Sequence, residues 1–275
     1  MHVPSVILSS CPDPLKEELP FSVELDLAQS HHLLNVLHKK RGDAVNIIFS
    51  EFATTGPATI SSTKDRVCVL SVKSLQTSVA NRKLILLAAY PKNKTADFIV
   101  EKAVEIGVTQ LIFFFSEHSP RAPGKSEVES RQTRFSRIVE SAMKQSGNTI
   151  ITKVSFSDSL DSAISSLQSE SERDNWNSPP PLKLVLTPGA PTNLLAIFTN
   201  SSSPDCLDIP ETIPLEINRN HADAIIIVGA EGGLSPREQQ LALDRNYRGV
   251  SLGKNIMRME TAVIAACSIA RIAES

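Results

Sequence analysis

Short apolar runs that alternate with amphipathic helical patterns constrain the fold of this chain more than any other feature of its sequence. Residues 83–89 and 110–115 are apolar runs of the kind found in strands that are buried on both faces of a sheet. The segment 95–106 between them repeats its apolar side chains at helical spacing and is followed by Gly107, a residue typical of helix ends. Because strands alternating with helices predict a mostly parallel, helix-covered sheet, we expect an α/β fold.

The same alternation continues along the rest of the chain. Residues 128–146 predict a long helix, and Ser235 with Glu238 forms a capping box that predicts the start of another. Further strands are expected at 183–186, 224–228 and 249–252.

The N-terminal part of the chain has a different pattern. Short strand-like runs separated by turn residues predict β-strands at 5–8, 21–25, 44–49, 58–60 and 66–72. One helical patch, residues 30–40, interrupts them. We therefore expect a small β-rich domain at residues 1–76, followed by the α/β domain at residues 77–275.

The 275-residue chain has a formal net charge of −2, which is not typical of an RNA-binding protein, but its charge is unevenly distributed. Residues 158–174 and 200–223 each hold five acids and one base, whereas residues 118–148 hold six Lys or Arg and three Glu. We interpret the two acidic segments as surface connections, with loops at 175–181 and 200–220. A basic face elsewhere on the protein is therefore allowed.

The composition disfavours several classes of protein. The four cysteines are scattered without a C-x-x-C pair, so we expect neither a disulfide framework nor a metal site. No apolar run approaches the roughly 20 residues that span a bilayer. The first residues lack the basic start and long apolar stretch of a secretory signal. We therefore expect a cytoplasmic protein that uses neither a metal nor a membrane.

The strongest local motif is the apolar run 225–228 followed by Gly-Ala-Glu-Gly-Gly at 229–233. Glycines permit close approach of the backbone, and open α/β sheets bind ligands at the carboxyl ends of their strands. The spacing matches neither the G-x-G-x-x-G dinucleotide fingerprint nor a phosphate-binding P-loop. Two interpretations therefore stay open: a ligand-binding loop, and a tight strand-to-helix turn without a ligand.

A second motif, residues 251–262, joins another strand to a helical pattern rich in small residues. Its Arg258 lies at the junction of loop and helix, where a guanidinium could contact a phosphate or polarise a substrate oxygen. An ion pair with Glu260 or Glu231 is the structural alternative for this side chain. The small residues of the helix permit close packing against a neighbouring element or a second subunit.

Together these two motifs resemble the G-P-E-G-G and L-G-x-x-I-L-R-x-E-T-A signatures of the bacterial 16S rRNA uracil-N3 methyltransferases, the RsmE family. Other segments resemble this family in the same order along the chain: residues 31–38 with Gly42 and Asp43, the set Lys92, Lys102, Glu105, Gly107 and Val108, and residues 145–147. The chain departs from the family pattern at Ala230, which replaces a proline, and at His38 and His118, which replace arginines.

The resemblance implies an N-terminal PUA-like β-barrel at residues 1–76 and a C-terminal SPOUT methyltransferase domain with a trefoil knot at residues 77–275. It implies a homodimer that transfers a methyl group from S-adenosyl-L-methionine to N3 of a specific uridine in 16S rRNA of the small ribosomal subunit. Two alternatives stay open: a non-catalytic RNA-binding or ribosome-assembly protein of this fold, and a SPOUT enzyme acting on another RNA position such as a ribose 2′-oxygen. A nicotinamide-dependent oxidoreductase is least favoured, because the dinucleotide fingerprint is absent.

The resemblance also implies a set of site residues, carried over position by position. The cofactor would be bound by Leu186, Thr187, Pro188, Gly189, Gly229, Glu231, Gly232, Gly233, Leu252, Gly253, Ile256, Met257 and Arg258. Arg258 is the candidate that stabilises the uracil anion, and Glu231 is the candidate proton acceptor. RNA contacts are expected from His31, His32, Lys92, Lys94, Arg121, Lys125, Arg131 and Arg134. Valine in place of Gly232 is expected to abolish cofactor binding.

Overall fold

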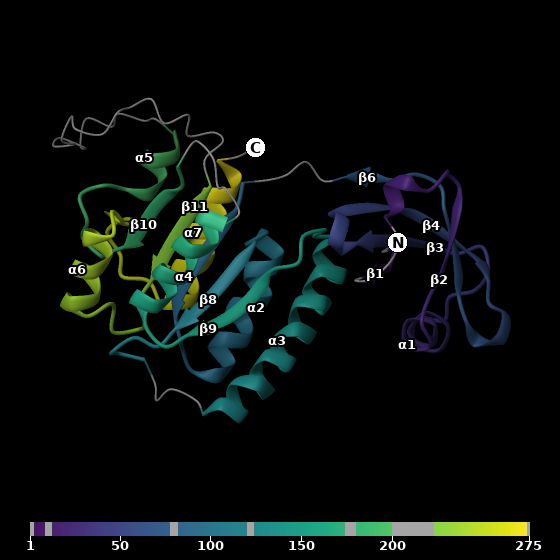
Figure 1. Ribbon diagram of the computed structural model, residues 1–275, viewed down its shortest axis with the longest axis horizontal. Coiled ribbons are helices and arrows are strands. Elements are labelled where there is room, and N and C mark those ends of the chain that lie inside the picture. The colour runs from purple at the N-terminus through teal and green to yellow at the C-terminus, as the bar shows by residue number, and fades with distance from the viewer. Residues whose placement is uncertain are drawn as a thin grey trace. The chain divides into compact units, whose positions relative to one another are not determined.

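The computed structural model describes residues 3–8, 13–77, 82–119, 124–173, 180–199 and 223–273. The chain forms two compact units, one made of residues 1–80 and 140–151 and the other of residues 81–139 and 152–275. Each unit contains a six-stranded sheet of its own (Figure 1).

The first sheet has the strand order β1-β3-β4-β5-β2, with β6 paired to β4. Its strands are β1 (Ser5–Leu8), β2 (Phe21–Glu24), β3 (Ala44–Phe49), β4 (Thr54–Ser62), β5 (Val69–Val72) and β6 (Gln76–Thr77). β1 and β3 are parallel, whereas the other paired strands are antiparallel. Among the described residues no pairing joins β1 to β2, so the closed PUA-like barrel stays a prediction.

The predicted helical patch at 30–40 lies further toward the N-terminus than expected. Helix α1 (Leu27–His31) continues as a π-helix at His32–Val36. Asp26 determines where it begins, because its side chain accepts a hydrogen bond from the Gln29 amide at 2.7 Å and satisfies one of the free N–H groups of the first turn.

The second sheet is entirely parallel and has the strand order β12-β10-β11-β7-β8-β9, which confirms the predicted α/β fold. Its strands are β7 (Leu84–Ala89), β8 (Gln110–Phe114), β9 (Lys153–Ser157), β10 (Leu182–Leu186), β11 (Ala224–Val228) and β12 (Arg248–Val250). The helices of this part of the chain are α2 (Asn93–Ile106), α3 (Lys125–Ser146), α4 (Leu160–Arg173), α5 (Leu194–Thr199), α6 (Pro236–Asp244) and α7 (Met259–Ile272).

One interpretation of the acidic segments is wrong. Residues 160–173 form the helix α4 rather than a surface connection, because Leu160, Ile164 and Leu167 recur at helical spacing and are buried. The acids of this segment therefore do not mark a loop. Residues 200–222 of the second acidic segment, and most of the loop expected at 175–181, lie outside the described residues.

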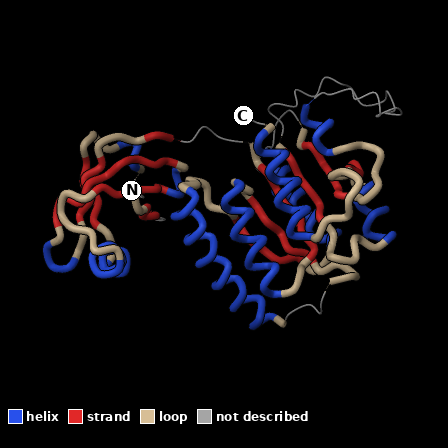
Figure 2. The backbone as a smooth tube through the Cα atoms, turned by 180° about the vertical axis from the view of Figure 1, so that it is seen from behind, coloured by secondary structure: helices blue, strands red, loops and turns tan. Residues whose placement is uncertain are grey.

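The helices cover the parallel sheet through apolar contacts. α7 packs against β7 and β11 with α2 and α5 beside it, and α4 packs against β7, β8 and β9 (Figure 2). Cys267 of α7 is fully buried, and burial raises the pKa of its thiol to about 12, so it is a core residue as predicted. Within the described residues, no helix combines the length and the apolar character needed to cross a membrane.

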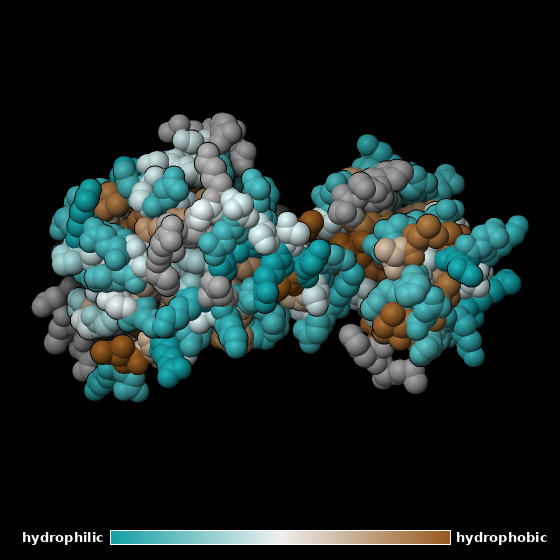
Figure 3. Space-filling view, turned by 90° about the horizontal axis from the view of Figure 1, so that it is seen from below, coloured by the Kyte–Doolittle hydropathy of each residue, from teal (hydrophilic) through white to brown (hydrophobic). Residues whose placement is uncertain are grey.

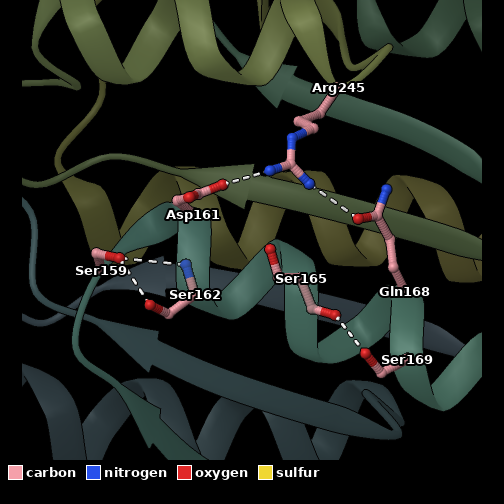
Figure 4. A network of polar contacts seen from close by, with 7 residues as sticks. All are labelled: Ser159, Asp161, Ser162, Ser165, Gln168, Ser169 and Arg245. Carbon is pink, nitrogen blue, oxygen red and sulfur yellow. Dashed lines mark hydrogen bonds and ion pairs between the residues drawn. The ribbon is translucent and has the colours of Figure 1, made fainter.

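Helix α6, which follows the glycine motif, is held against α4 by Arg245 (Figure 4). One guanidinium nitrogen of Arg245 lies 2.7 Å from an Asp161 carboxylate oxygen, and another donates to the Gln168 side-chain oxygen at 2.9 Å. Because this pair is partly exposed, it contributes roughly 0–1 kcal/mol. It therefore adds little to stability and links the C-terminal end of α6 to α4.

Candidate active site

A cleft lies at the carboxyl ends of β10 and β12. These two strands pair in parallel, and the Thr187 amide donates to the Val250 carbonyl oxygen at 2.9 Å, so the loops that follow them begin side by side. The cleft is lined by Leu186, Thr187, Pro188, Val250, Ser251, Leu252, Gly253, Asn255, Ile256, Met257 and Ala262. Parallel strands end at one edge of a sheet, which brings together segments that are far apart in the sequence.

The cleft combines two of the three segments that were predicted to bind the cofactor. The predicted residues that line it are Leu186, Thr187, Pro188, Leu252, Gly253, Ile256 and Met257. Gly189 and Arg258 adjoin this lining in sequence without contributing to it. Residues 229–233 do not line it either, although the pairing of Val185 with Ile227 places the end of β11 at the same edge of the sheet.

The sequence reasoning missed four lining residues. Val250, Ser251 and Asn255 lie beside or within the predicted segment, so a broader reading of that motif would have included them. Ala262 belongs to the first turn of α7, and only its packing in the folded chain brings it to the cleft.

No lining residue carries a charge, so apolar side chains and backbone groups dominate the cleft. Gly253 has a φ of 118°, a conformation that other residues rarely adopt, which explains the glycine at this point of the loop. Such a surface suits a flat, largely apolar group whose few polar atoms bind to the backbone. The adenine base of a nucleoside cofactor has this character, because it is flat, presents two apolar faces and carries its polar atoms at its edge.

The glycine loop 229–233 is a tight turn. The Gly233 amide donates to the Ala230 carbonyl oxygen at 2.8 Å. A Cβ atom at Gly229 would lie 2.8 Å from backbone atoms of Gly233 and Leu234, whereas the atoms nearest to one at Gly232 belong to the His118 side chain, at 3.5 Å. The packing of the turn itself therefore requires glycine at position 229.

A buried carboxylate connects this loop to the end of β8. Glu238, only 8% exposed, accepts hydrogen bonds from the Ser235 amide at 2.8 Å, the Ser116 hydroxyl at 2.9 Å and the Glu117 amide at 3.2 Å. Ser235 Oγ in turn accepts from the Glu238 amide at 3.2 Å, which completes the predicted capping box. The carboxylate therefore joins the first turn of α6 to the segment after β8.

Glu238→Gln is expected to lower the free energy of unfolding by about 1–3 kcal/mol, because the side-chain NH₂ group of glutamine would face one of the three donors that now bind the carboxylate. Urea unfolding followed by far-ultraviolet circular dichroism measures this change. Asp244→Asn, on the exposed end of the same helix, is the matched control and should stay within about 0.5 kcal/mol of the wild type. Equal midpoints for the two variants would contradict the anchoring role of Glu238.

The two candidate catalytic side chains are accessible. Arg258 is the N-cap residue of α7 and makes no side-chain capping hydrogen bond. Both Arg258 and Glu231 are exposed, and within the described part of the chain neither forms an ion pair. The alternative interpretation of Arg258, an ion pair with Glu260 or Glu231, is therefore not realised.

The predicted RNA contacts fall into two groups. His31, His32, Lys92 and Lys94 are exposed, and the two lysines lie at the start of α2, directly after β7. The other two described candidates are already paired with acids: Arg134 with Asp97, and Arg131 with Glu127. Arg121 and the side chain of Lys125 lie outside the described residues.

Arg131 also contacts a buried aromatic ring. Its guanidinium carbon lies 5.6 Å from the ring centre of Tyr90, which is 3% exposed, and burial raises the pKa of the Tyr90 hydroxyl. The Arg131 side chain is itself only 15% exposed. This arginine is therefore part of the packing around the end of β7.

The face shown in Figure 3 is largely hydrophilic, with separate apolar patches. Among the described residues, the most exposed large apolar ones are Ile256 at 87%, Ile272 at 71% and Leu27 at 68%. Ile256 belongs to the cleft, so an apolar group there faces solvent. The described residues contain no cluster of three or more His, Cys, Asp or Glu side chains arranged to hold a metal ion.

The chain is similar in sequence and in fold to RNA methyltransferases. A family model described as an RNA methyltransferase domain matches residues 79–271. The chain is 28% identical over 143 residues to ribosomal RNA small subunit methyltransferase E 2 of Borreliella burgdorferi, a match that covers 50% of this chain and 56% of that protein. It is 29% identical over 187 residues to ribosomal RNA small subunit methyltransferase E of Mesomycoplasma hyopneumoniae, and this match covers 66% of each. The chain thus spans less than two thirds of the length of either relative.

The fold is similar to a crystal structure of ribosomal RNA small subunit methyltransferase E from Neisseria gonorrhoeae bound to S-adenosyl methionine. The TM-score is 0.70 at 21% sequence identity, and the match covers 97% of this chain and 95% of that chain. Both units of the chain therefore have counterparts in a known structure.

Proposed function

Because the chain belongs to the RNA methyltransferase domain family, we propose that it methylates N3 of a uridine in 16S rRNA of the small ribosomal subunit, with S-adenosylmethionine as methyl donor. The two relatives described above are named as methyltransferases of small-subunit ribosomal RNA. The observation that carries the proposal is the uncharged cleft at the carboxyl ends of β10 and β12, formed by segments predicted to bind this cofactor.

The cofactor would be held by the loop after β10, at 186–188, and by the loop 250–257. Leu186, Leu252 and Met257 would supply apolar contacts to the cofactor, and the backbone of the two loops would supply hydrogen bonds. When bound, S-adenosylmethionine supplies an electrophilic methyl group. The glycine loop 229–233 would complete the site from the neighbouring strand β11.

The chain must also handle the target base. N3 lies on the Watson–Crick edge of uracil, so the base has to be unpaired or flipped out of its helix. Loss of the N3 proton leaves negative charge on the ring, and the exposed Arg258 guanidinium, at the N-terminus of α7, is our candidate for the group that stabilises it. Glu231, exposed in the glycine loop, is our candidate for the proton acceptor.

RNA backbone contacts are assigned to Lys92 and Lys94 at the end of β7, and to His31 and His32 in the N-terminal unit. Exposed lysines that have no acidic partner among the described residues are available to phosphates. Arg131 and Arg134 contribute only if RNA competes with Glu127 and Asp97 for them.

The organisation implied by the family belongs to the same proposal: a PUA-like barrel at residues 1–76 and a SPOUT domain with a trefoil knot at residues 77–275. We also propose a homodimer in the cytoplasm, where ribosomal subunits are modified. The exposed Ile272 and the small residues of α7 support a second subunit at this helix.

Methyl transfer from labelled S-adenosylmethionine to unmodified small subunits and to naked 16S rRNA tests the function, with nucleoside analysis of the product. We expect label in N3-methyluridine. Subunits already methylated at the target provide the control and should accept no label.

The other outcomes contradict specific parts of the proposal. Label in a ribose would move the reaction to a 2′-oxygen. Cofactor binding without label in either RNA would remove 16S rRNA as the substrate. Failure to bind the cofactor at all would favour a non-catalytic RNA-binding protein.

A further inference from the structure

The segment 116–119, which follows β8, lies against the glycine loop 229–233. His118 Nδ1 is 3.2 Å from the Gly233 carbonyl oxygen. A Cβ atom at Gly232 would lie 3.5 Å from Cβ, Cγ and Nδ1 of His118, so the imidazole also packs over this residue. One side chain therefore contacts two consecutive residues of the loop.

The chemistry of this contact determines the direction of the hydrogen bond. A carbonyl oxygen only accepts, so Nδ1 of His118 must carry the hydrogen. The Gly233 amide is already bonded within the turn, to Ala230, and Gly233 has a φ of 78°. Two hydrogen bonds therefore stabilise the turn: the backbone bond between Gly233 and Ala230, and the side-chain bond from His118 to Gly233.

His118 is suited to this task because its own backbone is anchored. The Ser116 hydroxyl and the Glu117 amide donate to the buried Glu238 carboxylate, at 2.9 Å and 3.2 Å. The His118 amide in turn donates to Ser116 Oγ at 3.4 Å. The imidazole itself is exposed, so replacing it leaves this buried anchor intact.

We propose that His118 is a positioning residue for the glycine loop: its Nδ1–H holds the Gly233 carbonyl and fixes the orientation of the peptide groups at 229–233. The consequence for S-adenosylmethionine binding rests on the proposed function, whereas the effect on the loop itself does not.

Three variants separate the hydrogen bond from the packing of the ring. His118→Ala removes both, and His118→Phe keeps a ring over Gly232 without a donor. His118→Asn keeps an N–H donor close to the place of Nδ1. Amide hydrogen exchange of a peptide covering 229–235 reports on the loop, and calorimetric titration with S-adenosylmethionine reports on the cofactor.

We expect His118→Ala and His118→Phe to speed exchange in this peptide by about three- to tenfold, the effect of losing one hydrogen bond, and to weaken cofactor binding by a similar factor. His118→Asn should restore both to within about twofold. In steady-state assays the KM for the cofactor should rise, while kcat and the KM for RNA should change little.

Unchanged exchange in His118→Ala would overturn the proposal, whether or not the chain methylates RNA. A loss of kcat in His118→Asn with intact exchange and affinity would also overturn it, because the ring would then act in the chemistry itself. Conversely, altered exchange in a chain that transfers no methyl group would uphold the positioning role and reject only the proposed function.

Discussion

Arg258→Ala is expected to lower the rate constant of methyl transfer at saturating substrates by about 10²–10³-fold, the loss typical of removing one preorganised contact to a developing anion. Its dissociation constant for S-adenosylmethionine should rise by less than about threefold, since the side chain lies outside the lining of the cleft. Single-turnover rates with small ribosomal subunits, together with calorimetric titration of the cofactor, measure the two quantities separately.

The fold should tolerate this change. The Arg258 side chain is exposed and makes no capping hydrogen bond, so the free energy of unfolding should change by at most about 0.5 kcal/mol. Arg258→Lys keeps the charge but loses the planar fork, and should recover only part of the rate. A loss of less than about fivefold in Arg258→Ala would exclude Arg258 as the group that stabilises the anion.

Gly229→Ala is expected to reduce methyl transfer by at least about 100-fold, because the glycine loop cannot keep its shape. The added methyl group would lie 2.8 Å from the Gly233 carbonyl carbon and the Leu234 amide nitrogen. Both are backbone atoms, so the turn must open instead of a side chain moving aside. Overpacking of this kind costs about 1–3 kcal/mol of stability, which thermal unfolding detects independently of activity.

Gly232→Ala is the matched control within the same loop. The atoms nearest to its Cβ would be those of the His118 side chain, at the ordinary contact distance of 3.5 Å, so stability should stay within about 0.5 kcal/mol of the wild type. Equal losses of stability in the two variants would show that the loop responds to any side chain and not to the crowding at position 229. Gly232→Val tests position 232 with a larger side chain. From the motif, we expect this variant to lose cofactor binding.

The periodicity of the sequence predicted most elements of the parallel sheet. The run 224–228 is the strand β11 with identical limits, and the capping box at Ser235 begins α6. Such signals are local: a strand buried on both faces needs consecutive apolar residues, and a helix start needs a partner for its free amides. The helix α4 was missed because its many acids and serines outweighed the apolar spacing of Leu160, Ile164 and Leu167.

The family resemblance implied two cofactor-binding segments, 186–189 and 252–258, and most of their residues line one cleft. It did not predict that Arg131 and Arg134 are paired with Glu127 and Asp97, since a count of basic residues does not show which of them are already neutralised.

By itself, the sequence determined the α/β class, the positions along the chain of most of the second unit's strands and the segments that follow them, because burial and capping act between near neighbours in the chain. Only the tertiary structure decided which of these segments touch. The Ser116–Glu238 hydrogen bond joins residues 122 positions apart, and His118 reaches Gly233 across 115 positions. Contacts of that range leave no periodic trace in a single sequence, since they depend on the strand order β11-β7-β8, which places the two loops at one edge of the sheet.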